Sequence, residues 1–289
     1  MYAWFYGLIM AMQARPSYII DGDLSQTIKP LDRGLAYGDG VFRTMQTKGG
    51  MPVCWPLHYQ KLVADCAAIG IVCPSADLLM HDFVQLLVEP DLESNKLGVA
   101  KIIITRGEGE RGYKTPAVTC PSRILIQSTM PSYAPDTYTT GVDLHLCELR
   151  LAAQPKLAGI KHLNRLENIM ARMEWRDDAA FDGLLLDQQD NAIECTMANL
   201  FARYGNQLLT PDLMQCGVSG ITRERILSLA SVLNLTVQVT QLPLARLMQA
   251  DEVLICNSLF GVFQVRSIQN ASWPQQALAK NFRALLSHD

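Results

Sequence analysis

Two runs of β-branched and aliphatic residues most constrain the fold of this chain: VAKIIIT at 99–105 and RILIQS at 123–128. Runs of this length and composition predict β-strands. The segment GEGERGYKTPAV at 107–118 lies between them and is polar and rich in glycine, which predicts a mobile hairpin loop. The first half of the chain is therefore expected to hold a sheet with a long loop at one end.

Strand-like and helix-like runs alternate along the rest of the chain and divide it into two parts. Strands are predicted at 18–21, 41–46, 51–55, 142–148, 183–186, 192–196, 199–204, 236–239 and 252–256, and helices at 58–69, 77–87 and 221–233. These patterns predict a mixed α/β (α+β) fold of two domains. The expected parts are an N-terminal extension at 1–16, a small α/β domain at 17–130, a linker at 131–136, and a larger domain with mainly antiparallel strands at 137–289.

Composition excludes several classes of function. The chain has 289 residues, and nearly half of them are apolar, which is enough for a sizeable core. A net charge of −3 without a basic stripe argues against nucleic-acid binding. The eight cysteines form no CxxC pair, so we expect neither disulfides nor a bound metal, and we expect a cytoplasmic protein. The apolar run at the N-terminus is too short to span a membrane, and we expect no membrane association.

Lys161 stands immediately before a run with helical spacing. Leu163, Leu166, Met170 and Met173 recur on one face, which predicts a helix that buries this face. Asn164 and Glu167 have the spacing of a capping box, so the helix is expected to begin at Asn164. A lysine in this position is either a solvated surface residue or a functional amine, and the motif alone does not decide between these two interpretations.

Further along the chain, a carboxylate and a helix start add to this amine. Glu194 lies within the apolar strand AIECTMANLF, where burying a carboxylate costs free energy unless a partner group compensates the charge. The segment CGVSGITRERIL at 216–227 directs the backbone amides of Ile221 and Thr222 outward, which suits a phosphate. GEGERG at 107–112 matches GxGxxG, but no helix follows it, so a dinucleotide site is not expected. An amine, a strand carboxylate and a phosphate cradle together indicate pyridoxal 5'-phosphate.

The chain resembles the fold-type IV pyridoxal-phosphate enzymes, a family that holds branched-chain and D-amino acid aminotransferases and 4-amino-4-deoxychorismate lyase. The segments that carry the resemblance occur in the family's order from about Ser17 onward. They are DRGLAYGDGVFRT (32–44), HYQKL (58–62), RGY (111–113), KHLNRLE (161–167), ECTMANLF (194–201), GVSGITRERI (217–226) and ADEVLICNSL (250–259). KHLNRLE and CNSL favour the lyase branch.

The resemblance implies roles for particular residues. Lys161 would be the Schiff-base lysine and catalytic base, and Glu194 would hold the pyridine nitrogen, supported by Asn199. The phosphate would be bound by Ile221, Thr222 and Ser258. The family usually has arginine where this chain has Lys61, which is expected to reach the phosphate more weakly because it lacks the bidentate fork. Substrate contacts are expected from Tyr37, Arg111, Tyr113 and Asn257.

The implied activity is the conversion of 4-amino-4-deoxychorismate to 4-aminobenzoate and pyruvate in folate biosynthesis. Two alternatives stay open at this point: a D-amino acid or branched-chain amino acid aminotransferase of the same fold, and a binding protein that has kept the scaffold without catalysis. The substrate in either enzyme is a small molecule. The family also implies a homodimer.

Overall fold

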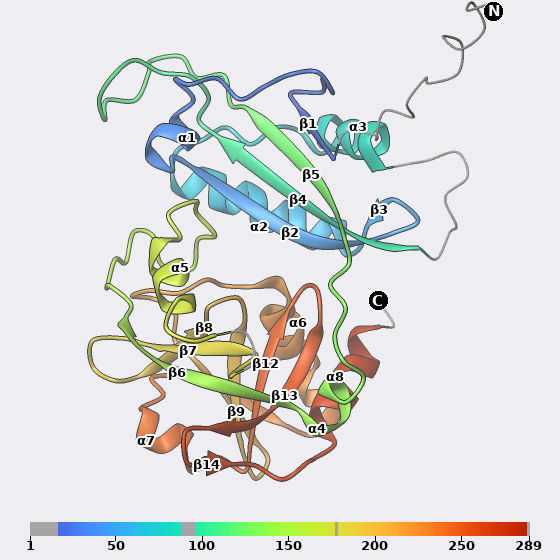
Figure 1. Cartoon of the computed structure of the whole chain (residues 1–289), viewed down its shortest axis with the longest axis vertical. Coiled ribbons are helices and arrows are strands. Elements are labelled where there is room, and N and C mark those ends of the chain that lie inside the picture. The colour runs from blue at the N-terminus through green and yellow to red at the C-terminus, as the bar shows by residue number, and fades with distance from the viewer. Residues whose placement is uncertain (1–16, 88–95, 177–178, 288–289) are drawn as a thin grey trace, which may run out of the picture.

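The computed structural model describes residues 17–87, 96–176 and 179–287, which form two domains, each built around its own sheet (Figure 1). The proposed extension at 1–16 lies outside the described residues. The first sheet uses residues between 18 and 129 and the second uses residues between 142 and 272. We retain 131–136 as the proposed linker, since this segment lies between the two sheets in the sequence.

The N-terminal domain is an antiparallel sheet of five strands in the order β1-β5-β4-β2-β3. Strands β4 and β5 pair antiparallel along their length, so the hairpin predicted from the two apolar runs is confirmed. The strand bounds are Tyr18–Ile20 (β1), Gly40–Lys48 (β2), Met51–Pro52 (β3), Leu97–Thr105 (β4) and Arg123–Thr129 (β5).

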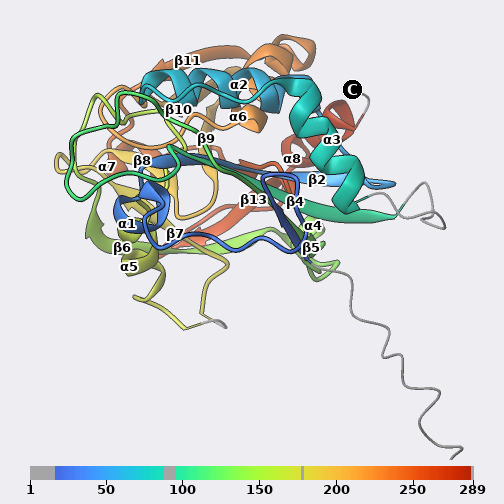
Figure 2. The ribbon, with the colours of Figure 1, turned by 90° about the horizontal axis from the view of Figure 1, so that it is seen from above.

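Helices α2 (Trp55–Ala68) and α3 (Ala76–Leu87) cover one face of this sheet (Figure 2). Both helices were predicted from their apolar spacing. Their inner faces bury Leu62, Phe83 and neighbouring residues against strand side chains such as Met45 and Ile102. A short helix, α1 (Arg33–Tyr37), precedes β2.

The C-terminal domain holds a nine-stranded sheet in which six strands form a closed path. The order is β11-β10-β9-β12-β13-β6-β7-β8, with β14 paired to β13, and β8 pairs in turn with β9. The pairs β10–β11, β13–β6 and β6–β7 are parallel, and the other described pairs are antiparallel. The bounds are Val142–Arg150 (β6), Asp182–Leu186 (β7), Ala192–Cys195 (β8), Asn199–Tyr204 (β9), Gln207–Pro211 (β10), Thr236–Thr240 (β11), Glu252–Asn257 (β12), Gly261–Ile268 (β13) and Ala271–Ser272 (β14).

Helices α6 (Ile221–Leu229) and α8 (Leu278–Leu286) pack together on the outside of this sheet and bury Ile226 and Phe282 there. The single helix predicted at 221–233 ends earlier, because residues Ala230–Leu233 tighten into a 3-10 turn, η1. Asn234 then closes this turn with a left-handed backbone conformation. Two short helices, α4 (Thr137–Thr140) and α7 (Leu244–Leu247), lie at the ends of strands.

The helix predicted after Lys161 exists, but two details of that prediction were wrong. Helix α5 spans only Leu166–Arg172, and Leu166, Met170 and Met173 are 58–78% exposed rather than buried. The buried residue of α5 is Ala171, because only one edge of this short helix packs against β6 and β7.

The capping box predicted before α5 does not form. The Asn164 Nδ2 donates to the carbonyl of Gly38 at 3.1 Å, which ties the segment to the N-terminal domain. The Glu167 carboxylate accepts from the backbone N–H of Ala152 at 2.9 Å instead of from the helix start. Tertiary contacts thus replace the local capping bonds.

Candidate active site

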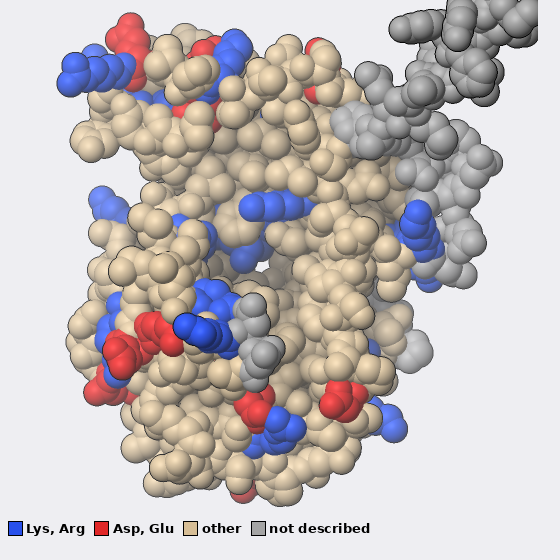
Figure 3. Space-filling model, in the orientation of Figure 1, with Lys and Arg blue, Asp and Glu red and all other residues tan. Residues whose placement is uncertain are grey.

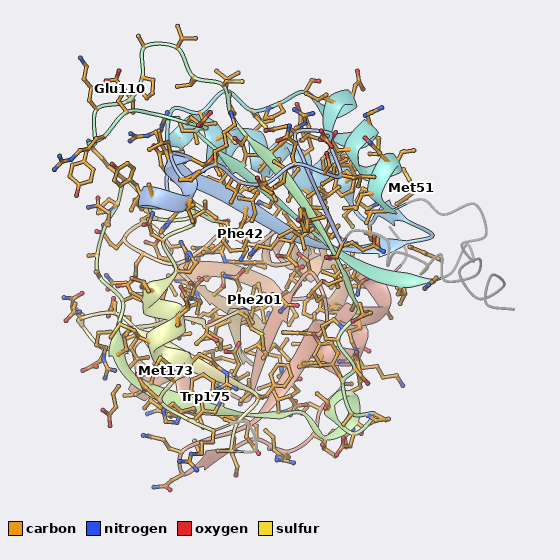
Figure 4. The ribbon with its side chains drawn as sticks, turned by 45° about the horizontal axis from the view of Figure 1, so that its top comes forward. Phe42, Met51, Glu110, Met173, Trp175 and Phe201 are labelled. Atoms are coloured by element: carbon orange, nitrogen blue, oxygen red, sulfur yellow. The ribbon has the colours of Figure 1, made fainter. Side chains whose placement is uncertain are left out.

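A cavity of about 480 Å³ lies where the two domains meet. Its wall comes from β2, the segment before α5, the turn between β8 and β9, the start of α6 and the end of β12. The space-filling view shows a hollow between the upper and lower parts of the molecule, with Lys and Arg atoms inside it (Figure 3). Phe42, which lines the cavity, lies between the domains in Figure 4.

Lys161 reaches this cavity because its segment adds to the edge of β2. The backbone N–H of Phe42 donates to the Lys161 carbonyl at 2.9 Å, and that of Leu163 donates to Gly40 at 3.0 Å. The Lys161 ammonium lies 4.8 Å from the centre of the Phe42 ring. Burial and the nearby guanidinium of Arg43 lower the pKa of Lys161 to about 8. Near physiological pH the neutral form of this amine is therefore more populated than in an ordinary lysine, and the neutral form can act as a nucleophile or base.

Glu194 lies in the wall of the same cavity, at the pairing that closes the strand path of the second domain. It is paired with Asn199 between β8 and β9 and is only 4% exposed. Its Oε2 accepts from the backbone N–H of Val218 at 2.8 Å. Burial raises the pKa of Glu194 to about 7, although the Val218 bond and the charges of Arg165 and Lys161 oppose this shift. A cationic group in the cavity would stabilise the charged form of this buried carboxyl group.

The loop before α6 is shaped by a glycine and by Asn199. Gly217 has a φ of +85°, and a Cβ at this position would lie 2.9 Å from Ile193 Cγ2 and 3.4 Å from Glu194 Oε2. The Asn199 side chain accepts from the Gly220 N–H at 3.1 Å and donates to the Val218 carbonyl at 2.7 Å. These bonds fix the loop that presents the start of α6 to the cavity.

The start of α6 provides backbone donors at one end of the cavity. Ile221 and Thr222 both line it, and the first amides of a helix have no acceptor within the helix. Gly220 precedes them without a side-chain cap. The helix dipole adds partial positive charge at the same point, which favours an anion.

Ser258 and Asn257 line the cavity from the end of β12. The Asn257 Oδ1 accepts from the backbone N–H groups of Leu259 and Phe260 at 2.9 and 3.0 Å, and its Nδ2 donates to Met197. Asn257 thus holds the turn that places Ser258. We found no hydrogen bond of the Ser258 hydroxyl among the described residues, so it is available to a ligand.

Lys61 is not in the cavity wall. Its ammonium forms an ion pair with Asp65 one turn along α2 and donates to the carbonyl of Gly159 at 2.9 Å. Two residues near Lys61 that were not predicted from the motifs do line the cavity: Arg43 of β2 and His58 of α2. Burial, with the charge of Arg43, lowers the pKa of His58 to about 3, so its imidazole is neutral.

Tyr37, Arg111 and Tyr113 also lie outside the cavity wall. The Tyr37 hydroxyl accepts from the backbone N–H of Gly112 at 3.0 Å, and its ring lies 5.5 Å from that of Tyr113. These residues order the base of the loop between β4 and β5. Figure 4 shows the tip of this loop, at Glu110, pointing away from the domain junction where Phe42 lies.

The sequence reading also missed Arg165 and Asn168 in the cavity wall. The Arg165 Nε donates to the His162 carbonyl at 2.9 Å, and Asn168 donates to the Thr196 carbonyl at 3.0 Å. Arg43, His58 and Arg165 stand inside the motifs VFRT, HYQKL and KHLNRLE, which were the available signal. Which members of a motif face a cavity depends on strand and helix orientation, which the motif letters do not give.

The site fits a phosphorylated aromatic aldehyde. An amine of lowered pKa, a buried carboxylate and a helix start line one cavity, and its volume is in the range of ligand sites. Two residues of its wall each carry an enclosed nitrogen without a hydrogen-bond partner, Arg43 at Nε and His58 at Nδ1. Within residues 17–87, 96–176 and 179–287, no cluster of three or more His, Cys, Asp or Glu side chains suits a metal ion. Over the same ranges, no helix has the length and apolar character needed to cross a membrane.

Comparison with known proteins agrees with this geometry. The family model of amino-transferase class IV matches residues 40–268. The chain belongs to the class IV aminotransferase family. The described cavity, with Lys161 and Glu194 in its wall, therefore lies in a class IV fold.

Three relatives of this class IV chain illustrate the range of the family. An aminodeoxychorismate lyase from Vibrio harveyi is 37% identical over 85% of this chain and 89% of its own length. The crystal structure of 4-amino-4-deoxychorismate lyase from Pseudomonas aeruginosa has a TM-score of 0.87 and 38% identity, covering 94% of this chain and 98% of that one. A D-alanine aminotransferase from Bacillus licheniformis is 26% identical over 89% of each chain.

Proposed function

We propose that this protein is a pyridoxal-phosphate-dependent lyase that converts 4-amino-4-deoxychorismate to 4-aminobenzoate and pyruvate. The observation that carries the proposal is the shared cavity of Lys161 and Glu194 at the start of α6. The lyase is favoured over an aminotransferase because the Vibrio and Pseudomonas lyases are 37% and 38% identical, against 26% for the D-alanine aminotransferase.

When bound, pyridoxal phosphate supplies an aldehyde that bonds to an amine and a protonated ring that withdraws electrons. Glu194 holds the proton at the ring nitrogen, and the attraction between the two groups compensates the burial of its carboxylate. Ile221, Thr222 and Ser258 bind the phosphate group through backbone amides and a hydroxyl. Asn199, which also lines the cavity, supports the ring end through the loop that it holds.

Lys161 moves the protons of the reaction. Its amine, neutral in part because of burial, removes the proton from the substrate carbon that bears nitrogen. It then donates this proton to the methylene carbon of the departing enolpyruvyl group, which leaves as pyruvate. The remaining ring becomes aromatic, so the elimination is strongly downhill and the main task of the protein is orientation.

The substrate contacts remain proposals. Asn257 is suitably placed in the cavity wall. Tyr37, Arg111 and Tyr113 do not reach the cavity of their own chain, so a role for them needs movement of the loop or a second copy of the chain. Lys61 is bound to Asp65, and a role at the phosphate would require it to leave that carboxylate.

We also propose a homodimer and a cytoplasmic location. The support for a dimer is a set of exposed apolar side chains on one side of the molecule, where α1 and α5 both lie in Figures 1 and 2. These side chains are Leu35, Tyr113, Leu166, Ile169, Met170 and Met173. A second copy would remove them from water.

The deciding experiment measures products from the purified protein with pyridoxal phosphate. Release of 4-aminobenzoate and pyruvate in equal amounts from 4-amino-4-deoxychorismate supports the lyase. Rapid conversion of the cofactor to its amine form by D-alanine or leucine, without 4-aminobenzoate formation, would establish the aminotransferase instead.

A Lys161→Ala variant provides the control for this assay. It is expected to lose turnover and the visible absorption of the lysine-bound cofactor together, because no other amine occupies that position. Undiminished turnover by the variant would refute the role of Lys161. Absence of any cofactor absorption in the unaltered protein would favour the binding protein without catalysis.

A further inference from the structure

The phosphate end of the cavity needs more positive charge than backbone amides provide. The start of α6 offers Ile221 and Thr222, but a helix end carries only about half an elementary charge. A phosphate group carries between one and two negative charges near neutral pH. A nearby cationic side chain is therefore expected. Arg225 of α6 already donates to the Leu286 carbonyl at 2.8 Å, and the other candidates are the cations packed between α2 and β2.

Lys61 is already engaged away from the cavity. Its ammonium is held by Asp65 and by the Gly159 carbonyl, which together take two of its three donors. Asp65 is almost completely buried, so removing Lys61 from this partner would leave part of a buried carboxylate uncompensated. Lys61 is thus better described as a partner of Asp65 than as an anion ligand.

Arg43 also pairs with Asp65 but, unlike Lys61, lines the cavity. It lies on β2 on the same strand face as Val41 and Met45, which pack in the core against α2, and it is only 3% exposed. One terminal nitrogen of its guanidinium pairs with Asp65. The Nε has no hydrogen-bond partner and is enclosed by the protein, and we found no hydrogen bond of the other terminal nitrogen, Nη1, among the described residues, although Arg43 lines the cavity together with Ile221 and Thr222. A buried donor without an acceptor is costly, and a ligand oxygen at Nη1 would remove that cost.

The charges of this cluster also favour an anion. Arg43 and Lys61 contribute two positive charges and Asp65 contributes one negative charge, which leaves one positive charge in excess. His58, whose Nδ1 is also without a partner, is neutral and adds no charge. One phosphate group at the start of α6 would balance the excess and provide an acceptor for Arg43 Nη1.

We propose that Arg43, rather than Lys61, is the side-chain cation that binds the phosphate group of the cofactor, and that Asp65 positions both cations. This inference rests on the proposed binding of pyridoxal phosphate. The proposed ligand is a residue of strand β2, whereas the sequence predicted Lys61 of helix α2. The planar guanidinium can pair with Asp65 through one terminal nitrogen and present the other to the phosphate.

The test compares the affinity of the full-length protein for pyridoxal 5'-phosphate and for pyridoxal, which lacks the phosphate group. Both dissociation constants are measured by absorbance titration for the unaltered protein, Arg43→Gln and Lys61→Gln. Arg43→Gln is expected to weaken pyridoxal 5'-phosphate binding by roughly 10- to 100-fold, the usual contribution of a hydrogen bond to a charged group. Pyridoxal binding should change less than this, because only the effect of Arg43 on the Lys161 amine applies to it. Lys61→Gln should retain the preference for the phosphorylated form.

A second variant guards against misfolding of Arg43→Gln. The triple change Arg43→Gln, Lys61→Gln and Asp65→Asn removes the three charges as a unit, so neither the carboxylate nor the lysine is left without its partner. It should show the same selective loss of phosphate recognition, with thermal unfolding close to that of the unaltered protein. In addition, inorganic phosphate should compete with pyridoxal 5'-phosphate in the unaltered protein and compete far less in this variant.

The outcomes distinguish failure of the assignment to Arg43 from failure of the proposed function. If Lys61→Gln loses the preference for the phosphorylated form, alone or together with Arg43→Gln, the assignment to Arg43 rather than Lys61 is overturned. It is also overturned if neither variant loses the preference. If the unaltered protein binds neither form, the proposed function itself fails.

Discussion

The buried carboxyl group of Glu194 gives a quantitative prediction for the stability of the cofactor-free protein. Burial raises its pKa from an ordinary value of 4.5 to about 7. A raised carboxyl pKa means that the folded state holds the proton more tightly than the unfolded state does. The stability from this group is therefore fully present below pH 4.5 and is lost as the pH rises through about 7.

The size of the effect follows from the shift. Each pKa unit corresponds to about 1.4 kcal/mol, so a shift of this size corresponds to about 3 kcal/mol. Glu194→Gln removes the titration and keeps an oxygen that can accept from the Val218 N–H. Urea unfolding at about pH 4 and about pH 8 should show a loss of free energy of unfolding that is about 3 kcal/mol larger for the unaltered protein than for the variant.

One further measurement, made with the cofactor bound, sharpens this test. Asp182 is also buried, and burial raises its pKa to about 6, but it is present in both proteins and cancels in the comparison. Saturating pyridoxal phosphate should reduce the difference, because the ring nitrogen then stabilises the charged carboxylate. Equal pH dependence of the two cofactor-free proteins would refute the reasoning that Glu194 titrates near neutrality because it is buried.

Two other predictions concern the loop before α6 and the exposed apolar face. Gly217→Ala should lower the free energy of unfolding in urea by roughly 2 kcal/mol or more, because its φ is positive and a Cβ there would meet close contacts. Gly205→Ala also has a positive φ but open space around the Cβ, so it should lose only the free energy that the unfavourable φ costs. A similar loss for both variants would contradict the packing argument. Met170→Lys combined with Met173→Lys should shift the protein from dimer to monomer in light scattering, while Val72→Lys, at an equally exposed site, should not. A dimer that survives the paired change would show that this face is not the interface.

Local pattern in the sequence was sufficient for most elements of the fold. The β-branched runs of β4 and β5 and the apolar spacing of α2 and α3 report local burial, so their positions were predicted to within a few residues. Strands β10 and β13, which belong to the C-terminal sheet, and helix α8, which packs on it, were not predicted. Helix α1 of the N-terminal domain was not predicted either.

The segment around Lys161 shows where local pattern is misleading. Asn164 and Glu167 have capping-box spacing, but both side chains bond to distant backbone groups instead. The apolar spacing of Leu166, Met170 and Met173 predicted a buried face that the chain leaves exposed. Periodicity reports that a face is apolar, and it carries no information on which molecule covers that face.

The sequence by itself determined which chemical groups are present: an amine at Lys161, a carboxylate at Glu194 and a glycine-led helix start at Ile221. Their order along the chain identified the family. Only the tertiary structure decided that Arg43 and Lys61 both pair with Asp65 and that only Arg43 of these two cations lines the cavity. The physical reason is that competition among buried charges for one carboxylate depends on the packing of β2 against α2, and residues far apart in the sequence set that packing.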